Sequence, residues 1–239
     1  MERTVVKQGR RVRYLTRGSG RAVVLLHGFS QSSDSWAEAG VLDALASTFK
    51  VVAIDRLGHG GSDSPADVSA YDEGAALDDI TSVLAAASID DAALWGFSLG
   101  AKSAMSFAIR EPERVRALVQ GSAPPLDGAK LERFFTTVDG VLEEHGLGAL
   151  YASLGVTDPE RIAHAVEVND DQALRLTLAG SLGDVPDPRS LSVPWLYYYG
   201  SAERPGPASS DLDAVAGNAG EGCDGPVRWV VDERAAHSQ

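Results

Sequence analysis

Short apolar runs alternate with longer segments of helical periodicity through the first half of the chain. Residues 22–26 and 51–54 are continuous apolar runs rich in β-branched side chains, which is typical of strands buried on both faces. Residues 34–48, 71–87 and 99–110 instead repeat apolar side chains at helical spacing. We expect further strands at residues 3–7, 11–16, 92–95 and 115–120, the first two as an antiparallel pair. This alternation predicts a mostly parallel sheet with helices on both faces.

The pattern changes in the second half of the chain. Between residues 126 and 189 the strand signal disappears, and apolar side chains recur at helical spacing. Strand-like runs resume at residues 195–199 and 227–231. We therefore predict a sheet-based core formed by residues 1–125 and 190–239, with a helical insertion at residues 126–189.

Composition narrows the classes of function. The 239 residues are 44% hydrophobic and 23% charged, with a formal net charge of −13, which is the balance of an ordinary globular protein. The negative charge argues against nucleic acid and against an anionic membrane as partners. One cysteine, Cys223, excludes an intramolecular disulfide, and no Cys/His spacing indicates a metal site. Without a signal-peptide core or a membrane-length apolar run, a cytoplasmic protein is predicted.

The most specific motif is Gly96-Phe97-Ser98-Leu99-Gly100, which lies between a predicted strand and a predicted helix. A G-x-S-x-G motif in this setting is a nucleophile elbow, whose tight turn exposes the serine hydroxyl at the carboxyl end of the sheet. The two glycines lack a Cβ, so the strand and the helix can approach closely. The alternative interpretation is that Ser98 only caps the helix.

Two further segments carry a resemblance to a known family. His27-Gly28-Phe29 follows the strand at residues 22–26, and an Asp-x-x-Gly-x-Gly-x-Ser pattern fills residues 55–62. With the serine motif, these segments resemble the α/β-hydrolase superfamily over nearly the whole chain. The resemblance implies an α/β-hydrolase fold, with an eight-stranded sheet and a helical cap at residues 126–189.

The resemblance also implies roles for individual residues. Ser98 would be the nucleophile, and the backbone N–H groups of Phe29 and Leu99 would form the oxyanion hole. His27 would be structural, with a catalytic base as its alternative role, and His59 would belong to the supporting loop. A phosphate-binding loop is the rival interpretation of residues 55–63, but no Gly-Lys-Ser/Thr follows.

The base and the acid of a catalytic triad follow from chain order, which in this family is Ser, acid, His. His237 lies shortly after the last predicted strand and is the expected base. Glu203 follows the preceding strand, where the family more often has Asp. Asp127 is the alternative acid, and Asp211 and Asp213 are further candidates. The family usually continues with a helix, whereas the sequence ends at Gln239, so we expect a loosely held His237 loop.

The resemblance implies hydrolysis through an acyl-enzyme, with no metal and no organic cofactor. A serine nucleophile excludes the aspartate-based chemistry of the related epoxide hydrolases and haloalkane dehalogenases. We expect a small-molecule substrate, namely a small or medium carboxylic ester, a lactone or a thioester. Candidate pocket residues are Phe29, Trp36, Phe134 and Phe135, with Leu150 and Tyr151 in the insertion.

Two other functions stay open on the sequence alone. The first is another reaction of the same fold, namely that of a biosynthetic thioesterase, a carbon–carbon bond hydrolase or a cyclase. The second is a non-catalytic binding protein that kept the serine turn, because a fold does not fix a function.

Overall fold

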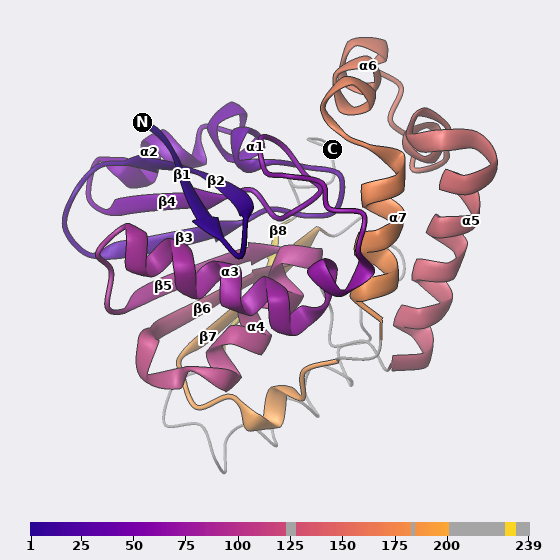
Figure 1. The fold of residues 1–239 in the computed structure, drawn as a ribbon. Coiled ribbons are helices and arrows are strands. Elements are labelled where there is room, and N and C mark those ends of the chain that lie inside the picture. Colours follow the sequence, from indigo (N-terminus) through magenta and orange to yellow (C-terminus); the bar gives the residue numbers. More distant parts are fainter. Residues whose placement is uncertain (123–127, 183–184, 201–227, 233–239) are drawn as a thin grey trace.

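A twisted sheet of eight strands forms the centre of the computed structural model, which describes residues 1–122, 128–182, 185–200 and 228–232 (Figure 1). The strand order within this described part is β1-β2-β4-β3-β5-β6-β7-β8. The first two neighbouring pairs, β1–β2 and β2–β4, are antiparallel, and the pairs that follow them are parallel. The strands are β1 Glu2–Lys7, β2 Arg10–Arg17, β3 Ala22–Leu26, β4 Lys50–Ile54, β5 Ala92–Phe97, β6 Val115–Gly121, β7 Trp195–Gly200 and β8 Arg228–Asp232. The mostly parallel sheet predicted from the sequence is thus confirmed.

The central strands are buried on both faces, as their apolar runs predict. In β3, Val24 packs into one core cluster with helices α3 (Glu73–Ala86) and α4 (Leu99–Arg110). Its neighbour Leu25 points to the opposite face, where it packs into a second cluster with Trp36 and Leu42. Both Val24 and Leu25 are fully buried. Two layers of helices therefore cover the sheet, with α3 and α4 in front in the view of Figure 1.

One of the predicted helices is divided in the structure. The segment 34–48 forms α1 (Ser33–Glu38) and α2 (Val41–Ala46), because Gly40 between them has a φ of 72° and cannot continue a helix. Helical periodicity does not reveal this interruption. The segment 71–87 forms the single helix α3 as predicted, preceded by a short 3-10 helix, η1 (Val68–Tyr71). Asp72 separates the two with extended backbone, and its carboxylate caps α3 by accepting the Ala75 N–H.

Three longer helices occupy the segment for which an all-helical insertion is expected. They are α5 (Gly128–Ser153), α6 (Pro159–Val168) and α7 (Asp171–Gly180), and α5 is interrupted at Gly146. In Figure 1 they stand together beside the carboxyl ends of the central strands. Short 3-10 helices η2 (Pro112–Arg114) and η3 (Pro188–Ser190) complete the described elements.

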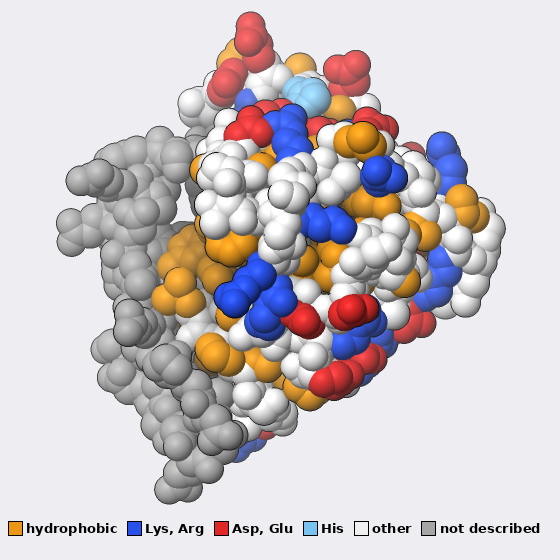
Figure 2. Space-filling model, turned by 90° about the vertical axis from the view of Figure 1, so that its left-hand side faces the viewer, with side chains coloured by type: hydrophobic (Ala, Val, Ile, Leu, Met, Phe, Trp, Pro, Cys, Tyr) orange, Lys and Arg blue, Asp and Glu red, His pale blue; other side chains and the backbone are white. Residues whose placement is uncertain are grey.

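On the face drawn in Figure 2, the surface charge is mixed. On the side of the molecule drawn in Figure 2, Lys and Arg side chains are scattered among acidic and uncharged ones. Acidic side chains gather at the top, at the height where α6 lies in Figure 1. Along the stretches that the structure describes, every helix is too short or too polar to cross a bilayer.

Candidate active site

Ser98 lies in a sharp turn between β5 and α4. Its φ is 50° and its ψ is −116°, a conformation that non-glycine residues rarely adopt and that is found mainly at functional sites. The turn is held because the Ser98 N–H donates to the Gly121 carbonyl at 2.8 Å. Ser98 occupies the N-cap position of α4, but its side chain makes no capping hydrogen bond. The hydroxyl is therefore not engaged in the role that the alternative interpretation gave it.

The two glycines of the motif are required by close backbone contacts. A Cβ at Gly96 would collide with the Gly100 carbonyl and with the Ala101 backbone, so the start of α4 lies directly against β5. A Cβ at Gly100 would collide with the Leu26 carbonyl at the end of β3. The helix thus approaches β3 as well as its own strand, which brings Ser98 beside the loop that follows β3.

That loop contains His27, Gly28 and Phe29. A Cβ at Gly28 would lie 3.4 Å from the Ser98 Cβ, so the loop passes directly over the Ser98 turn. The Gly28 carbonyl is bonded to the His27 Nδ1 at 2.8 Å and accepts the Gln31 N–H at 3.2 Å. In a trans peptide the N–H points opposite to the carbonyl, so the Phe29 N–H points away from His27. Within the described part of the chain, neither the Phe29 N–H nor the Leu99 N–H has a hydrogen-bond acceptor.

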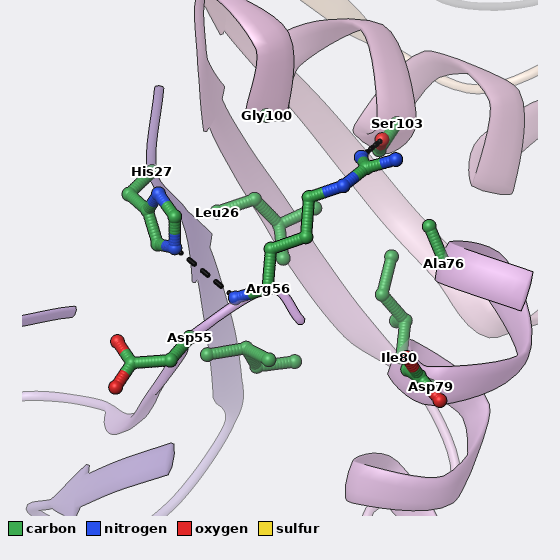
Figure 3. Close-up of a pocket in the computed structure, with 10 residues that line it drawn as sticks. Leu26, His27, Asp55, Arg56, Ala76, Asp79, Ile80, Gly100 and Ser103 are labelled. Atoms are coloured by element: carbon green, nitrogen blue, oxygen red, sulfur yellow. Dashed lines mark hydrogen bonds between the residues drawn. The ribbon is translucent and has the colours of Figure 1, made fainter. Parts of the chain in front are cut away.

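His27 is held by both of its ring nitrogens. The Arg56 backbone N–H donates to Nε2 at 3.1 Å (Figure 3). The ring hydrogen is therefore on Nδ1 and is donated to the Gly28 carbonyl. Burial lowers the pKa of His27, which keeps the ring neutral. With both nitrogens engaged, His27 holds the loop in shape and leaves no nitrogen to accept a proton from Ser98.

His59 is a second buried histidine beside this loop. Its ring centre lies 5.2 Å from that of His27 and 5.9 Å from that of Phe29. Burial lowers the pKa of His59 to about 3. A neutral His59 therefore packs against the His27–Phe29 loop instead of charging near neutral pH.

Asp55 ties the loop after β4 to its surroundings. The fully buried carboxylate accepts the Ser33 N–H at 2.6 Å, the Gly61 N–H at 2.9 Å and an Arg13 guanidinium N–H at 2.8 Å. Burial alone would raise the pKa of Asp55, but the hydrogen bonds from Arg13, Ser33 and Gly61 outweigh it and lower the pKa. Asp55 therefore joins the end of β4 to the middle of β2 and to the start of α1. Arg13 carried no signal of this role in the sequence, because its partner is far away along the chain.

A cavity of about 30 Å³, lined by both charged and apolar residues, lies beside His27 and Arg56 (Figure 3). It is lined by Leu26, His27, Ile54, Asp55, Arg56, Ala76, Asp79, Ile80, Gly100 and Ser103. The Arg56 guanidinium donates to the Ser103 hydroxyl at 2.9 Å, to the Tyr71 carbonyl at 3.1 Å and to the Ser181 hydroxyl at 3.3 Å. This volume holds one or two water molecules, so the cavity is too small for an organic substrate.

The predicted base and acids, namely His237, Glu203, Asp127, Asp211 and Asp213, lie outside the described residues. The strands that precede them, β6, β7 and β8, are described. Gly200 at the end of β7 is in register with Asp232 at the end of β8, and Phe97 at the end of β5 is in register with Gly121 in β6. The carboxyl ends of these parallel strands therefore meet at the edge of the sheet where Ser98 lies.

The structure brings some of the predicted pocket residues together and separates others. Phe29, Leu99 and Phe135 share one apolar cluster between the His27–Phe29 loop and α5–α7. Leu150 is buried in that cluster and Tyr151 packs against it. Phe134 points elsewhere and is 52% exposed. Trp36 packs on the other face of the sheet, with its ring centre 5.4 Å from that of Trp95.

Comparison with known proteins agrees with this architecture. Residues 21–153, more than half of the chain, match the family model of the alpha/beta hydrolase fold. The chain therefore belongs to the α/β-hydrolase fold family.

Within the described residues, no three His, Cys, Asp or Glu side chains are grouped so that they could hold a metal ion.

Individual relatives carry the names of different reactions. The chain is 36% identical over 118 residues to a Bacillus subtilis protein named "putative 2-succinyl-6-hydroxy-2,4-cyclohexadiene-1-carboxylate synthase". It is 38% identical over 123 residues to the 2-hydroxymuconate semialdehyde hydrolase of Pseudomonas sp. strain CF600. These matches cover 48% and 51% of this chain, and 42% and 43% of the relatives. The chain thus spans less than half the length of both curated relatives.

The similarity in structure extends further along the chain. The enol-lactonase of Burkholderia xenovorans LB400 superposes with a TM-score of 0.80 over 97% of this chain and 91% of that chain. Its sequence is 17% identical, so this likeness concerns the fold alone.

Proposed function

We propose that this protein is a serine hydrolase that cleaves a small or medium carboxylic ester through an acyl-enzyme. The observation that carries the proposal is the Ser98 turn. Its backbone is held at a φ of 50°, its side chain makes no capping hydrogen bond, and the His27–Phe29 loop passes over it. Strained backbone of this kind persists only when the surrounding structure holds it, and such strain is concentrated at functional sites.

In the proposed reaction, His237 removes the Ser98 proton while the serine oxygen attacks the ester carbonyl carbon. The Phe29 and Leu99 N–H groups stabilise the oxyanion of the tetrahedral intermediate. This intermediate collapses to an acyl-enzyme as His237 returns the proton to the departing alcohol. Water activated by His237 then releases the acid. Glu203 orients the imidazole, with Asp127 as the alternative. These steps use neither a metal nor an organic cofactor.

Strand geometry supports His237 as the base. β8 lies three strands from β5 in the sheet, a distance of about 14 Å at the usual strand spacing. His237 follows the end of β8 at Asp232 by five residues. Five residues span up to about 17 Å when extended, so the chain is long enough for His237 to reach Ser98.

The helices α5, α6 and α7 are proposed to form a cap, residues 126–189, over a core of residues 1–125 and 190–239. The apolar cluster that joins Phe29 and Leu99 to Phe135 supports a pocket for an apolar acyl group. Phe134 and Trp36 lie away from this cluster, and we retain Phe29 and Phe135 as the proposed walls. Lactones and thioesters present the same carbonyl chemistry to Ser98.

A covalent probe tests the nucleophile directly. A fluorophosphonate should add to the wild-type protein as Ser98 displaces fluoride, and intact mass should show one adduct that Ser98→Ala lacks. A panel of p-nitrophenyl esters of increasing chain length then ranks acyl size, with a thioester and 2-hydroxymuconate semialdehyde as competing substrates. If the wild type forms no adduct, the hydrolase proposal is wrong, and a non-catalytic binding protein becomes the better description.

The same panel identifies the acid of the triad. We expect Glu203→Gln to abolish turnover and Asp127→Asn to leave it within about threefold of wild type, because a triad acid is worth orders of magnitude in rate. If only Asp127→Asn abolishes turnover, Asp127 is the acid and Glu203 is a surface carboxylate.

A further inference from the structure

Two side chains of the helical segment contact the residue that directly follows Phe29. This residue, Ser30, is 8% exposed and has a φ of 57°. Tyr151, near the end of α5, places its hydroxyl 3.2 Å from the Ser30 Oγ and 3.4 Å from the Ser30 carbonyl oxygen. Asn169, directly after α6, donates from Nδ2 to the same carbonyl at 3.1 Å. These contacts join residues 121 and 139 positions apart.

The direction of each hydrogen bond follows from the partners. The Ser30 hydroxyl donates to the Phe29 carbonyl at 2.7 Å, so its one hydrogen is already used. Tyr151 is therefore the donor toward Ser30. The Asn169 Nδ2 also donates to the Ala165 carbonyl at 2.8 Å. Because both of its partners are carbonyl oxygens, the orientation of the Asn169 amide is fixed.

Ser30 needs such support because of its backbone. A positive φ brings the Cβ of a non-glycine residue too close to the next carbonyl, so the residue relaxes to negative φ unless contacts hold it. A relaxed Ser30 would rotate the peptide that joins it to Phe29. On the other side of Phe29, the Gly28 carbonyl is held by His27 and Gln31. The loop is thus fastened to the core at Gly28 and to the helical segment at Ser30, with the Phe29 N–H between the two.

We propose that Tyr151 and Asn169 are positioning residues, which hold Ser30 in its left-handed conformation and thereby aim the Phe29 N–H at the oxyanion. This inference rests on the proposed function of Ser98 and goes beyond it, because it makes the oxyanion hole depend on the helices α5 and α6. An oxyanion donor acts on the transition state more than on bound substrate. Loss of the two contacts should therefore lower kcat and leave KM nearly unchanged.

The test uses Tyr151→Phe, which removes only the hydroxyl, together with Asn169→Leu and the double variant. Ser153→Ala is the matched control, because it removes a hydroxyl of the same helix whose hydrogen-bond partner among the described residues is the Leu150 carbonyl. Two measurements report on the oxyanion hole, namely the second-order rate of fluorophosphonate labelling and the affinity for a trifluoromethyl ketone, whose adduct with serine places a negative oxygen there. Affinity for the corresponding alcohol, in which a hydroxyl replaces the ketone and a methyl group replaces the trifluoromethyl group, reports ground-state binding.

We expect the double variant to lose about 10- to 100-fold in labelling rate, in kcat and in affinity for the trifluoromethyl ketone, since small misplacements of catalytic groups cost up to about 100-fold. Affinity for the alcohol and KM should stay within about twofold of wild type in all variants, and Ser153→Ala should behave as wild type. If the double variant is labelled at the wild-type rate, or if it loses alcohol and ketone affinity equally, the positioning role is wrong. If the wild type itself is not labelled, the proposed function fails and the positioning role fails with it.

Discussion

Two buried ionic clusters flank the loop that carries Phe29, and they are built differently. On one flank, Asp55 receives two backbone N–H groups and the Arg13 guanidinium. On the other flank, Lys102 donates to the Glu73 carboxylate at 2.6 Å, and both residues are almost fully buried. The Arg56 charge acts on the Glu73 carboxylate, and Arg56 lines the water-sized cavity together with Asp79. Among the described residues, the buried Arg56 Nε has no hydrogen-bond partner.

The difference lies in what satisfies each charge. Two of the three groups that donate to the Asp55 carboxylate are backbone N–H groups. The geometry of these hydrogen bonds therefore depends on the backbone conformation of the segments that contain Ser33 and Gly61. The second cluster is held by long side chains and borders a cavity with room for water, so it can adjust when one group changes. We therefore expect the Asp55 cluster to determine the fold of the site, and the Glu73 cluster to be more tolerant.

The largest effect should come from Asp55→Asn. The amide cannot pair with Arg13 as a carboxylate does, and one of its two ends presents hydrogens to a backbone donor. Breaking a buried charge pair by changing one partner typically costs about 3–5 kcal/mol of unfolding free energy. Urea denaturation of the variant at pH 7 measures this loss.

A neighbouring exposed pair provides the control for Asp55. Asp63 accepts from the Arg11 backbone and side chain, but the Arg11 side chain is 64% exposed. Exposed ion pairs contribute at most about 1 kcal/mol, so Asp63→Asn should cost no more than that. If Asp55→Asn and Asp63→Asn lose the same unfolding free energy, the burial of Asp55 does not determine its contribution to stability.

A smaller loss is expected in the second cluster. Lys102→Met removes the direct partner of Glu73, but Arg56 still lowers the pKa of that carboxyl against the effect of burial. We expect Lys102→Met to lower the unfolding free energy by about 2–3 kcal/mol, which is less than the cost of leaving a buried charge with no counter-ion. The double variant Glu73→Gln with Lys102→Met should recover most of it. A double-mutant cycle by urea denaturation measures the coupling, and additive losses would show that the pair does not interact.

The distance along the chain between contacting residues explains which features the sequence could predict. The Ser98 turn is local, since its glycines, its strand and its helix are consecutive in the chain, and the structure has this turn as predicted. The division of residues 34–48 into two helices depends on the φ of Gly40, which apolar periodicity does not report. The contacts of Arg13 with Asp55 and of Asn169 with Ser30 join residues 42 and 139 positions apart. Such pairs satisfy no spacing rule, so their partners become visible only after the chain has folded.

The smallest effect, and the one of opposite sign, is expected from Asp79→Asn. Burial raises the pKa of Asp79 from 3.8 to about 6, although Lys7, Arg10 and Arg56 act against it. A carboxyl with a raised pKa in the folded state contributes full stability below pH 3.8 and loses that contribution as the pH rises through about 6. The shift corresponds to about 3 kcal/mol, which water in the cavity reduces.

Asp79→Asn should therefore unfold at higher urea concentration than wild type at pH 7. Its unfolding free energy should be higher by at most about 2 kcal/mol, and the decline in stability between pH 4 and pH 7 should be flatter.

Asp78→Asn is the matched control, because this exposed neighbour pairs with Lys7 and Arg110 and its pKa is lowered. Its loss should be slightly destabilising at pH 7, and a destabilised Asp79→Asn would mean that the second cluster is as dependent on its charges as the first.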